Sequence, residues 1–517
     1  MYSSAVLLAA LSVPLLASLV ALVAGPRKWV SRLGAAAAGA GFLAACVTTV
    51  DVLLHGPIRA TLQTGRGTLI AEVGADRLSA LLLVLVYGVS AVVQLFALRY
   101  LACDRRSGWF TAATGLLTSA SAGLMTAGTL IGLALSWSVA GAALCLLLAT
   151  YWELPAARDG VRRTVTAFLI GDAALWSAVA LITLLRGNRS LSALNADLIG
   201  NSSILAAIAV LIVAAALSRS AQIPFHRWLP ATLAAPTPVS ALLHAGVVNA
   251  GGVLLVRLSP IVSGSPVAMG IAFTAGLLSM VYGAIVMLTK ADIKGSLAYS
   301  TMAQMGFMVV TCGLGLSAAA VFHLVGHGFY KATLFLSSGS AIAKRRQKAA
   351  RPAAPVLTPA RRVAVQLTAL VLPAIALYLA AVVVPLHGTE HGSAQALLIF
   401  AWATAAAALL GWLGRSPNAR AVMAAAVALL GAAIGYLALL GAVTGFLAPS
   451  IPPVTVPSAS ALGIVVMAVV LGVLALLRQA PGDGWVGRLQ RVIYTKALVA
   501  GNVPAIRLTP QLTGAPR

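Results

Sequence analysis

Two histidines and a lysine at a spacing of four residues are the side chains best suited to chemistry. They are His323, His327 and Lys331, in Val321-Phe-His-Leu-Val-Gly-His-Gly-Phe-Tyr-Lys331. Residues at i, i+4 and i+8 share one face of an α-helix. Histidine exchanges protons near neutral pH, and a desolvated lysine gives up its proton readily, so the row can relay protons. Structural hydrogen bonding is one alternative. A metal site is another, although no carboxylate or thiol lies nearby in the sequence and the lysine would repel a cation.

One acidic residue lies well inside an apolar run, unlike the other Asp and Glu residues. It is Asp172, in Phe168-Leu-Ile-Gly-Asp172, and the whole sequence has only 11 acidic residues. A charge at the centre of a bilayer costs about 2.5–3.5 kcal/mol, so it persists where it has a partner or a function. Asp172 is therefore either a member of an ion path or the partner of a cytoplasmic base such as Arg162.

Prolines interrupt a later apolar run, in Ser218-Arg-Ser-Ala-Gln-Ile-Pro-Phe-His-Arg-Trp-Leu-Pro230. Pro224 and Pro230 remove backbone donors, and Arg219 comes directly before the interruption. The segment is either a broken helix at membrane depth, where protein or a watery path satisfies the freed groups, or a cytoplasmic loop anchored by Arg219 and Arg227.

The helix predicted after this interruption carries polar residues in its interior. They are His244 and Asn249, among small residues that allow close helix contact. A second proline break is predicted at Pro373, where no ionisable residue accompanies it.

The composition defines the elements that must position these side chains. Of 517 residues, 60% are hydrophobic and 9% charged, and the mean hydropathy is +0.98. Long apolar runs with few charges are solvated only by lipid, which excludes a soluble enzyme, a disordered tail and a disulfide scaffold. The sequence predicts an all-α polytopic membrane protein with about 14–15 transmembrane helices.

The basic residues predict the orientation. The net charge is +24, but most of the 35 Lys and Arg residues sit at the ends of apolar runs rather than on one polar domain. This pattern argues against nucleic acid as a partner and favours the lipid bilayer. It places the N-terminus outside and the C-terminus in the cytoplasm of a bacterial inner membrane. The four cysteines are dispersed singly, so no disulfide or metal site is expected.

Three segments are expected outside the spans. Residues 54–77, rich in glycine with short β-type pieces, predict an outer hairpin. Residues 344–362 are basic and rich in Pro and Ala, and predict a cytoplasmic link. Residues Trp485–Ala500 predict an amphipathic helix on the membrane or on a partner.

Five segments carry a family resemblance over about residues 70–340. They resemble the proton-conducting membrane subunits of complex I, such as subunit L, and of Mrp cation/proton antiporters. The segments are Ser220-Ala-Gln-Ile-Pro, Trp228-Leu-Pro, Pro236-Thr-Pro-Val-Ser-Ala-Leu-Leu-His244, Asp292-Ile-Lys-Gly-Ser-Leu-Ala-Tyr-Ser-Thr-Met-Ala-Gln-Met-Gly306 and Phe322-His…His327-Gly-Phe-Tyr-Lys-Ala-Thr-Leu-Phe-Leu.

The resemblance implies two inverted five-helix repeats, each with a broken helix. It divides the chain into N-terminal helices (1–105), a first repeat (106–258), a second repeat (259–415) and C-terminal helices with a tail (416–517). It also implies an ion-conducting subunit rather than an enzyme, without a metal or cofactor of its own. Asp172, His244, Lys294, His323, His327 and Lys331 would line the path. Arg219 would set the electrostatics of this path, and Pro224, Pro230 and Asn249 would mark the breaks in the helices that form it. Asp292 would pair with Lys290 or Lys294 at the cytoplasmic mouth.

The sequence departs from this family at several positions. Arg219 stands where the family has a lysine, and an arginine does not readily release its proton. Ser138 and Ala231 stand where complex I subunits carry acids, and the region of Pro373 has no charge. About 40 residues follow the last predicted span, which leaves no room for a long lateral helix.

A narrower branch fits these departures. Leu242-Leu-His-Ala-Gly-Val-Val-Asn-Ala-Gly-Gly-Val-Leu-Leu-Val-Arg257 is similar to DabB, the membrane subunit of the DabA–DabB inorganic-carbon transporter. This resemblance implies a DabA-like partner that holds zinc and handles CO2 or bicarbonate, driven by protons or sodium ions. The alternatives are a translocase subunit of an NADH-quinone oxidoreductase or hydrogenase, an Mrp-type sodium/proton antiporter, and a non-conducting scaffold.

Overall fold

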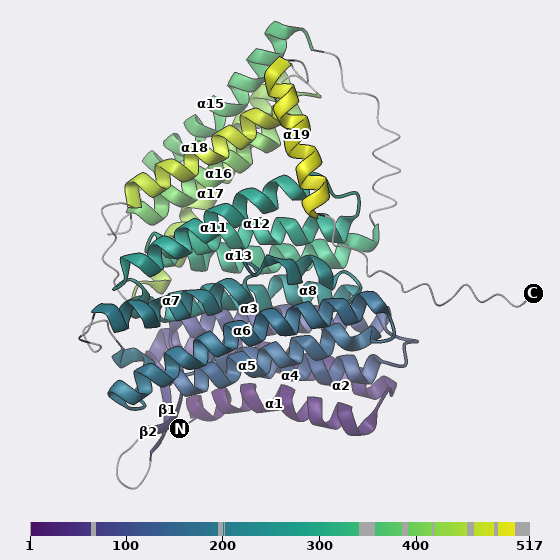
Figure 1. The fold of residues 1–517 in the computed structure, drawn as a ribbon, viewed down its shortest axis with the longest axis vertical. Coiled ribbons are helices and arrows are strands. Elements are labelled where there is room, and N and C mark those ends of the chain that lie inside the picture. Colours follow the sequence, from purple (N-terminus) through teal and green to yellow (C-terminus); the bar gives the residue numbers. More distant parts are fainter. Residues whose placement is uncertain are drawn as a thin grey trace, which may run out of the picture.

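The chain folds into a stack of long helices with one short hairpin (Figure 1). The computed structural model describes residues 2–63, 69–194, 200, 202–340, 357–384, 391–415, 418–451, 460–479 and 484–501. The stack begins with α1 and ends with α15–α18, and α19 runs steeply across the other helices. Most of the predicted link at 344–362 and the tail beyond residue 501 lie outside the described residues.

Within the described part, 10 helical segments are long and apolar enough to cross a membrane. They are α1 (Tyr2–Ala24), α2 (Lys28–His55), α3 (Arg77–Tyr100), α5 (Leu130–Leu148), α6 (Pro155–Arg186), α7 (Ser202–Arg219), the pair α8 (Thr237–Ala245) and α9 (Ala250–Arg257), α11 (Pro266–Met287), α15 (Pro359–Val383) and α17 (Ala419–Leu447). Further helices occupy the remaining predicted runs: α4 (Ser107–Thr126), α12 (Ile293–Gly313), α13 (Ser317–Leu336), α16 (His391–Leu413) and α18 (Ser460–Gln479). The predicted all-α polytopic fold is confirmed.

The hairpin predicted at 54–77 is present. Strand β1 (Ile58–Gln63) pairs antiparallel with β2 (Leu69–Ala75), from Ile58 opposite Ala75 to Gln63 opposite Leu69. Two isolated bridges, Val73 with Ala127 and Thr129 with Ser190, join the hairpin region to the ends of α4, α5 and α6. The hairpin is therefore fixed to the helical stack.

The helix predicted over the tail is also present, as α19 (Gly484–Gly501). It packs against α11, and the Gly501 carbonyl accepts hydrogen bonds from Lys290 Nζ and from Tyr299 Oη. The end of α19 thus lies on the connection between α11 and α12.

The first proline interruption breaks a helix as predicted. Helix α7 ends at Arg219, a short 3-10 segment covers His226–Thr232, and α8 begins at Thr237. The following span is broken as well, which the sequence did not predict. Gly246 ends α8, and Val247–Asn249 form a 3-10 turn before α9.

The break predicted at Pro373 is wrong, because α15 is a continuous helix that contains this proline. A proline removes one backbone bond and disturbs the preceding turn. Here Trp402 Nε1 of α16 donates to the Leu370 carbonyl in that turn, at 2.9 Å. The carbonyl that loses its donor to Pro373 is that of Ala369, and the bond from Trp402 ties the adjacent residue of the same turn to α16.

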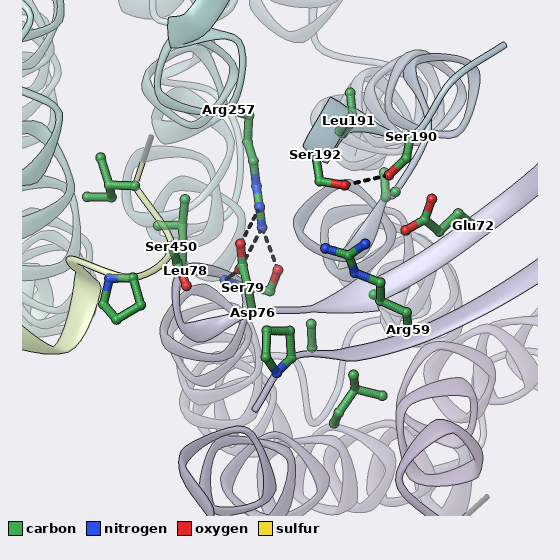
Figure 2. Close-up of a pocket in the computed structure, with 18 of the residues that line it drawn as sticks. Arg59, Glu72, Asp76, Leu78, Ser79, Ser190, Leu191, Ser192, Arg257 and Ser450 are labelled. Carbon is green, nitrogen blue, oxygen red and sulfur yellow. Dashed lines mark hydrogen bonds and ion pairs between the residues drawn. The ribbon is translucent and has the colours of Figure 1, made fainter. Parts of the chain in front are cut away.

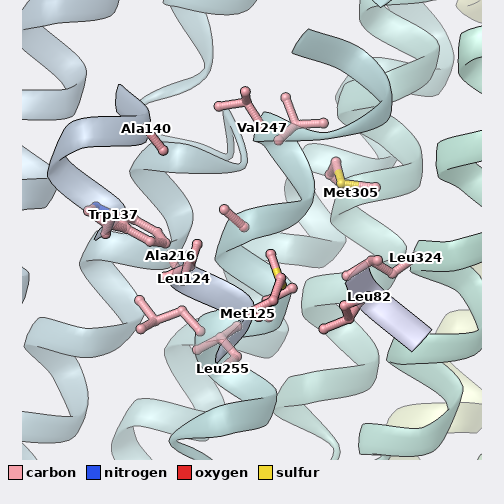
Figure 3. Packing of buried hydrophobic residues seen from close by; sticks show 14 of the residues in the cluster. Leu82, Leu124, Met125, Trp137, Ala140, Ala216, Val247, Leu255, Met305 and Leu324 are labelled. Atoms are coloured by element: carbon pink, nitrogen blue, oxygen red, sulfur yellow. The ribbon is translucent and has the colours of Figure 1, made fainter. Parts of the chain in front are cut away.

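The largest apolar core lies where the first broken helix meets its neighbours (Figure 3). Trp137 of α5, Ala216 of α7 and Val247 pack there with Met305 of α12 and Leu324 of α13. This core lies beside the polar groups described next, of which Arg219, His244, His327 and Lys331 are buried.

Candidate ion pathway

Two members of the His–Lys row on α13 are buried, and His323 is partly buried beside them. Lys331 is 0% exposed and His327 4%. The rings of His323 and His327 stack with their centroids 6.0 Å apart. Neither ring nitrogen of His327, nor Nε2 of His323, has a hydrogen-bond partner among the described residues. Buried polar atoms are normally paired, so these open nitrogens depart from the usual pattern.

Within the described part of the chain Lys331 has one polar partner, which sequence reasoning missed. Its Nζ donates to Ser300 Oγ of α12 at 2.8 Å. A single neutral hydroxyl holds the ammonium group in place without fixing its proton, whereas a carboxylate would hold the charge strongly. Ser300 lies in the segment of α12 that resembles the family. It is 31 positions from Lys331 in the sequence, so no local pattern of residues predicted the contact.

The structure brings His244 to the same group. Its ring stacks on Phe335, with centroids 4.3 Å apart and planes inclined by 11°. Phe335 lies one helical turn beyond Lys331 on α13, and α13 packs directly on α8. His244 Nδ1 is buried and has no partner among the described residues. Four of the predicted path residues therefore gather around α13.

The two predicted residues at the start of α12 have separate partners. Lys294 Nζ donates to the Ala235 carbonyl at 2.9 Å, beside the start of α8. The Asp292 carboxylate caps α12 and accepts from the Gly295 amide at 2.5 Å. The predicted ion pair between Asp292 and Lys290 or Lys294 is absent from the residues described. The Asp292 carboxylate accepts from the Gly295 amide at the start of α12, and Lys290 Nζ donates to the Gly501 carbonyl instead.

A second group surrounds the end of α7. Arg219 Nη2 lies 2.9 Å from Asp172 Oδ1 of α6, and the Arg219 side chain is 1% exposed. Trp137 Nε1 donates to the same carboxylate at 2.8 Å, and the Trp137 carbonyl accepts from Arg219 Nη1 at 3.2 Å. The guanidinium also lies over the rings of Trp137 and Phe168, 4.3 and 4.1 Å from their centroids. The partner of Asp172 is thus Arg219, not Arg162.

A glycine makes room for this guanidinium. A Cβ on Gly141 of α5 would lie 2.8 Å from Arg219 Nη2. Arg219 is therefore fixed by a carboxylate, two aromatic faces and a close backbone. Its positive charge is thereby held next to the carboxylate of Asp172, and the electrostatic role predicted for Arg219 stays a prediction.

The helix interruption itself is satisfied by protein groups. Trp228 Nε1 donates to the Ser218 carbonyl at 3.0 Å, and Ser220 Oγ donates to the Val248 carbonyl at 2.8 Å. Pro224 precedes the 3-10 segment, and Pro230 lies within it. The Ile223 amide donates to Ser279 Oγ at 2.9 Å. These contacts favour the broken helix over the surface loop.

Asn249 lies in the second interruption. Its Nδ2 donates to the Ala245 carbonyl at 2.7 Å. This bond replaces the backbone hydrogen bond that the Ala245 carbonyl loses where the helix is interrupted at Gly246. Its Oδ1 is buried and has no partner among the described residues. An open acceptor therefore lies one turn from His244.

The fold and these buried groups define a class: a multi-pass membrane subunit with broken helices and a buried row of basic side chains. The family model "NADH:quinone oxidoreductase/Mrp antiporter, TM" matches residues 127–413, and "NADH-Ubiquinone oxidoreductase (complex I), chain 5 N-terminus" matches residues 63–111. The chain belongs to this family of antiporter-like membrane subunits, and it is a multi-pass membrane protein, in agreement with the expected bacterial inner membrane.

Two relatives and one solved structure illustrate the similarity. "Probable inorganic carbon transporter subunit DabB1" of Halothiobacillus neapolitanus is 36% identical over 65% of this chain and 64% of its own length. "NAD(P)H-quinone oxidoreductase chain 5" of Synechocystis sp. is 36% identical over 52% of this chain and 40% of its own. The chain thus spans less than two thirds of either relative. The Mrp complex structure from Dietzia sp. shares the fold, with a TM-score of 0.64 over 98% of this chain and 61% of the other, at 24% identity.

Proposed function

We propose that this chain is the ion-conducting membrane subunit of an energy-coupled inorganic-carbon transporter. It would conduct protons or sodium ions and so drive a DabA-like partner that acts on CO2 or bicarbonate. The similarity to DabB1, which extends over 65% of the chain, supports this proposal. Zinc and the carbonic-anhydrase-like chemistry would belong to the partner.

The observation that carries ion conduction is the row of basic side chains on α13, with which no carboxylate forms an ion pair among the described residues. Lys331 is fully buried, and among the described residues it has only a serine hydroxyl as polar partner and His327 has none. A proton can pass along such groups because each can hold it and none is fixed by a carboxylate. Asp172 and Arg219 form a neutral pair and would set the potential near the row, and Lys294 would connect the row to the start of α8.

A second candidate is supported by the match to NAD(P)H-quinone oxidoreductase chain 5, with the same 36% identity. In that case the chain would be the proton-pumping subunit of a quinone oxidoreductase or hydrogenase, or of an Mrp-type sodium/proton antiporter. The chemistry would then be carried out by different neighbouring subunits.

Copurification separates these candidates. The tagged chain is extracted from its native membrane in mild detergent, and its companions are identified by mass spectrometry. A stoichiometric zinc-containing protein related to carbonic anhydrases supports the first proposal. Quinone-oxidoreductase or hydrogenase subunits, or a set of small Mrp-type subunits, contradict it.

Growth tests the role of the row. Lys331→Ala should abolish growth at ambient CO2 and leave growth at high CO2 intact, with the protein still present in the membrane. Lys28→Ala is the matched control, because Lys28 is an exposed lysine at the start of α2. Wild-type growth of Lys331→Ala at ambient CO2 would refute the relay.

A further inference from the structure

A cavity lies at the hairpin end of the helices, away from the groups discussed so far (Figure 2). Its volume is about 440 Å³, and its wall combines hairpin residues with the ends of α3 and α9 and the connection after α6. Its polar lining includes Arg59, Glu72, Asp76, Ser192 and Arg257. This cavity, called the hairpin cavity below, is large enough for several water molecules.

Glu72 of β2 places a carboxylate in this cavity. The residue is 7% exposed, and its carboxylate forms no hydrogen bond or ion pair with any residue that the structure describes. Figure 2 shows the side chain directed into the cavity beside Arg59 and Ser190. A buried carboxylate is costly unless a partner, a proton or an ion compensates it.

The fold makes specific room for Glu72. A Cβ on Gly128 would lie 2.4 Å from Glu72 Cγ, and the Gly128 amide donates to the Glu72 carbonyl at 2.8 Å. The Gly128 carbonyl in turn accepts from the Leu191 amide at 2.7 Å. Three chain segments thus hold the backbone of Glu72 at a fixed place, and its carboxylate has no partner among the described residues, as expected of a binding group.

A smaller cavity lies one helical turn deeper. Its volume is about 40 Å³, and its lining includes Leu82, Met125, Gly246, Asn249 and Val253. Leu82 and Val253 lie one turn from Leu78 and Arg257, which line the hairpin cavity. The volume exceeds the roughly 10–15 Å³ that one water needs. The open acceptor of Asn249 and the backbone next to His244 lie at its inner end.

An ion pair separates the two cavities. Arg257 of α9 reaches Asp76 at the start of α3, with Nη1–Oδ2 3.0 Å and Nη2–Oδ1 3.3 Å. Arg257 Nη2 also donates to Ser79 Oγ and to the Met125 carbonyl of α4, the latter at 2.9 Å. The guanidinium therefore connects α9, α3 and α4 between the cavities. A fixed positive charge at such a constriction excludes cations.

We propose that the hairpin cavity is the mouth of the ion pathway on that side, where Glu72 binds a proton or a sodium ion and the Asp76–Arg257 pair closes the route inward. Separation of the pair would join the hairpin cavity to the deeper one and so to the Gly246 interruption and His244. This proposal rests on the proposed conduction of a cation.

Cysteine accessibility tests the two cavities without requiring conduction. Cys46, Cys103, Cys145 and Cys312 are replaced by Ser, and single cysteines are introduced for Ser192 in the hairpin cavity or Val253 in the deeper one. A third, for Leu62, is the positive control because Leu62 is 60% exposed. Each variant in lipid nanodiscs reacts with a small uncharged methanethiosulfonate, so that the rate reports whether the route is open and not the charge along it. Mass spectrometry follows the rate.

The reaction at Ser192→Cys should proceed within about tenfold of the rate at Leu62→Cys. The reaction at Val253→Cys should be about 100-fold slower, as expected for a gate open in a minor state near 1%. Adding Asp76→Asn, which retains an acceptor for the α3 cap, or Arg257→Gln should accelerate it about tenfold. Arg106→Gln, which breaks the more exposed Arg106–Glu153 pair, should not. An unreactive Ser192→Cys, or a Val253→Cys rate that neither gate variant changes, overturns the proposal.

Transport by reconstituted complex then tests Glu72. Glu72→Gln should lower uptake of protons (pH-sensitive dye) or radioactive sodium by about tenfold, the scale of one lost charged contact. Glu153→Gln, which changes an exposed acid, should not. Unchanged uptake by Glu72→Gln overturns the role of Glu72. If the unmodified complex takes up neither ion, the proposed function fails, whereas the accessibility result still reports on the mouth and its gate.

Discussion

Neutralising Asp172 should destabilise the protein far more than neutralising a similarly exposed acid on the same helix. The Asp172 side chain is 19% exposed, and its partner Arg219 is 1% exposed. Asp159, also on α6, is 21% exposed, but its partner Arg163 is 28% exposed. The two acids are therefore matched, and the burial of the basic partner is the main variable.

The expected magnitudes follow from what remains after each substitution. Asp172→Asn leaves a guanidinium buried among Trp137, Phe168 and the α5 backbone without its counter-charge. Removing one partner of a buried pair costs about 3–5 kcal/mol, and the partial exposure of Asp172 favours the lower end. Asp159→Asn breaks an i,i+4 pair in which both partners reach solvent, which costs about 0.3–0.5 kcal/mol.

Unfolding of purified protein in mixed detergent and SDS, followed by far-ultraviolet circular dichroism, measures both changes. The double variant Asp172→Asn with Arg219→Gln should recover much of the loss, because the unpaired charge is then gone. A cost for Asp172→Asn no greater than that for Asp159→Asn would refute the view that Arg219 depends on this carboxylate.

Three further outcomes are expected. Gly141→Ala should lower the unfolding free energy by about 1–3 kcal/mol, because its Cβ would lie 2.8 Å from Arg219 Nη2. Gly39 is the control, because nothing lies within 4 Å of its Cβ position, and Gly39→Ala should leave the unfolding free energy unchanged or raise it by up to about 1 kcal/mol. Equal effects of the two substitutions would contradict the packing argument. Ser300→Ala removes the hydroxyl partner of Lys331 and should slow ion uptake by reconstituted complex, whereas Ser300→Thr should restore it; normal uptake by Ser300→Ala would show that the contact is dispensable. Burial raises the pKa of the Asp76 carboxyl, but Arg257 and the Ser79 hydrogen bonds outweigh it and hold the pKa below its usual value, so the pair is complete above about pH 4. Because acid also removes the reactive thiolate, the labelling rate of Val253→Cys is divided by that of Leu62→Cys at the same pH. This ratio should rise only below about pH 4, and a rise at neutral pH would argue against this gate.

The sequence determined the features that depend on local order along the chain. The four-residue spacing placed His323, His327 and Lys331 on one helix face, and the structure buries His327 and Lys331 with His323 partly buried beside them. Apolar runs located the helices, glycines and β-type residues located the hairpin, and paired prolines located the break after Arg219. Such features follow from backbone geometry and the cost of exposing apolar or polar groups, which a single segment already specifies.

Only the tertiary structure decided the partners. Asp172 pairs with Arg219, which is 47 positions away in the sequence, and Arg257 pairs with Asp76, which is 181 positions away. The sequence offered a nearer base for Asp172 and lysines for Asp292, whose carboxylate instead caps α12 because helix amides lie closer than any ammonium group. Helix packing also kept α15 intact at Pro373 and broke the next span at Gly246. These outcomes depend on which helices become neighbours, and a local pattern of residues does not contain that information.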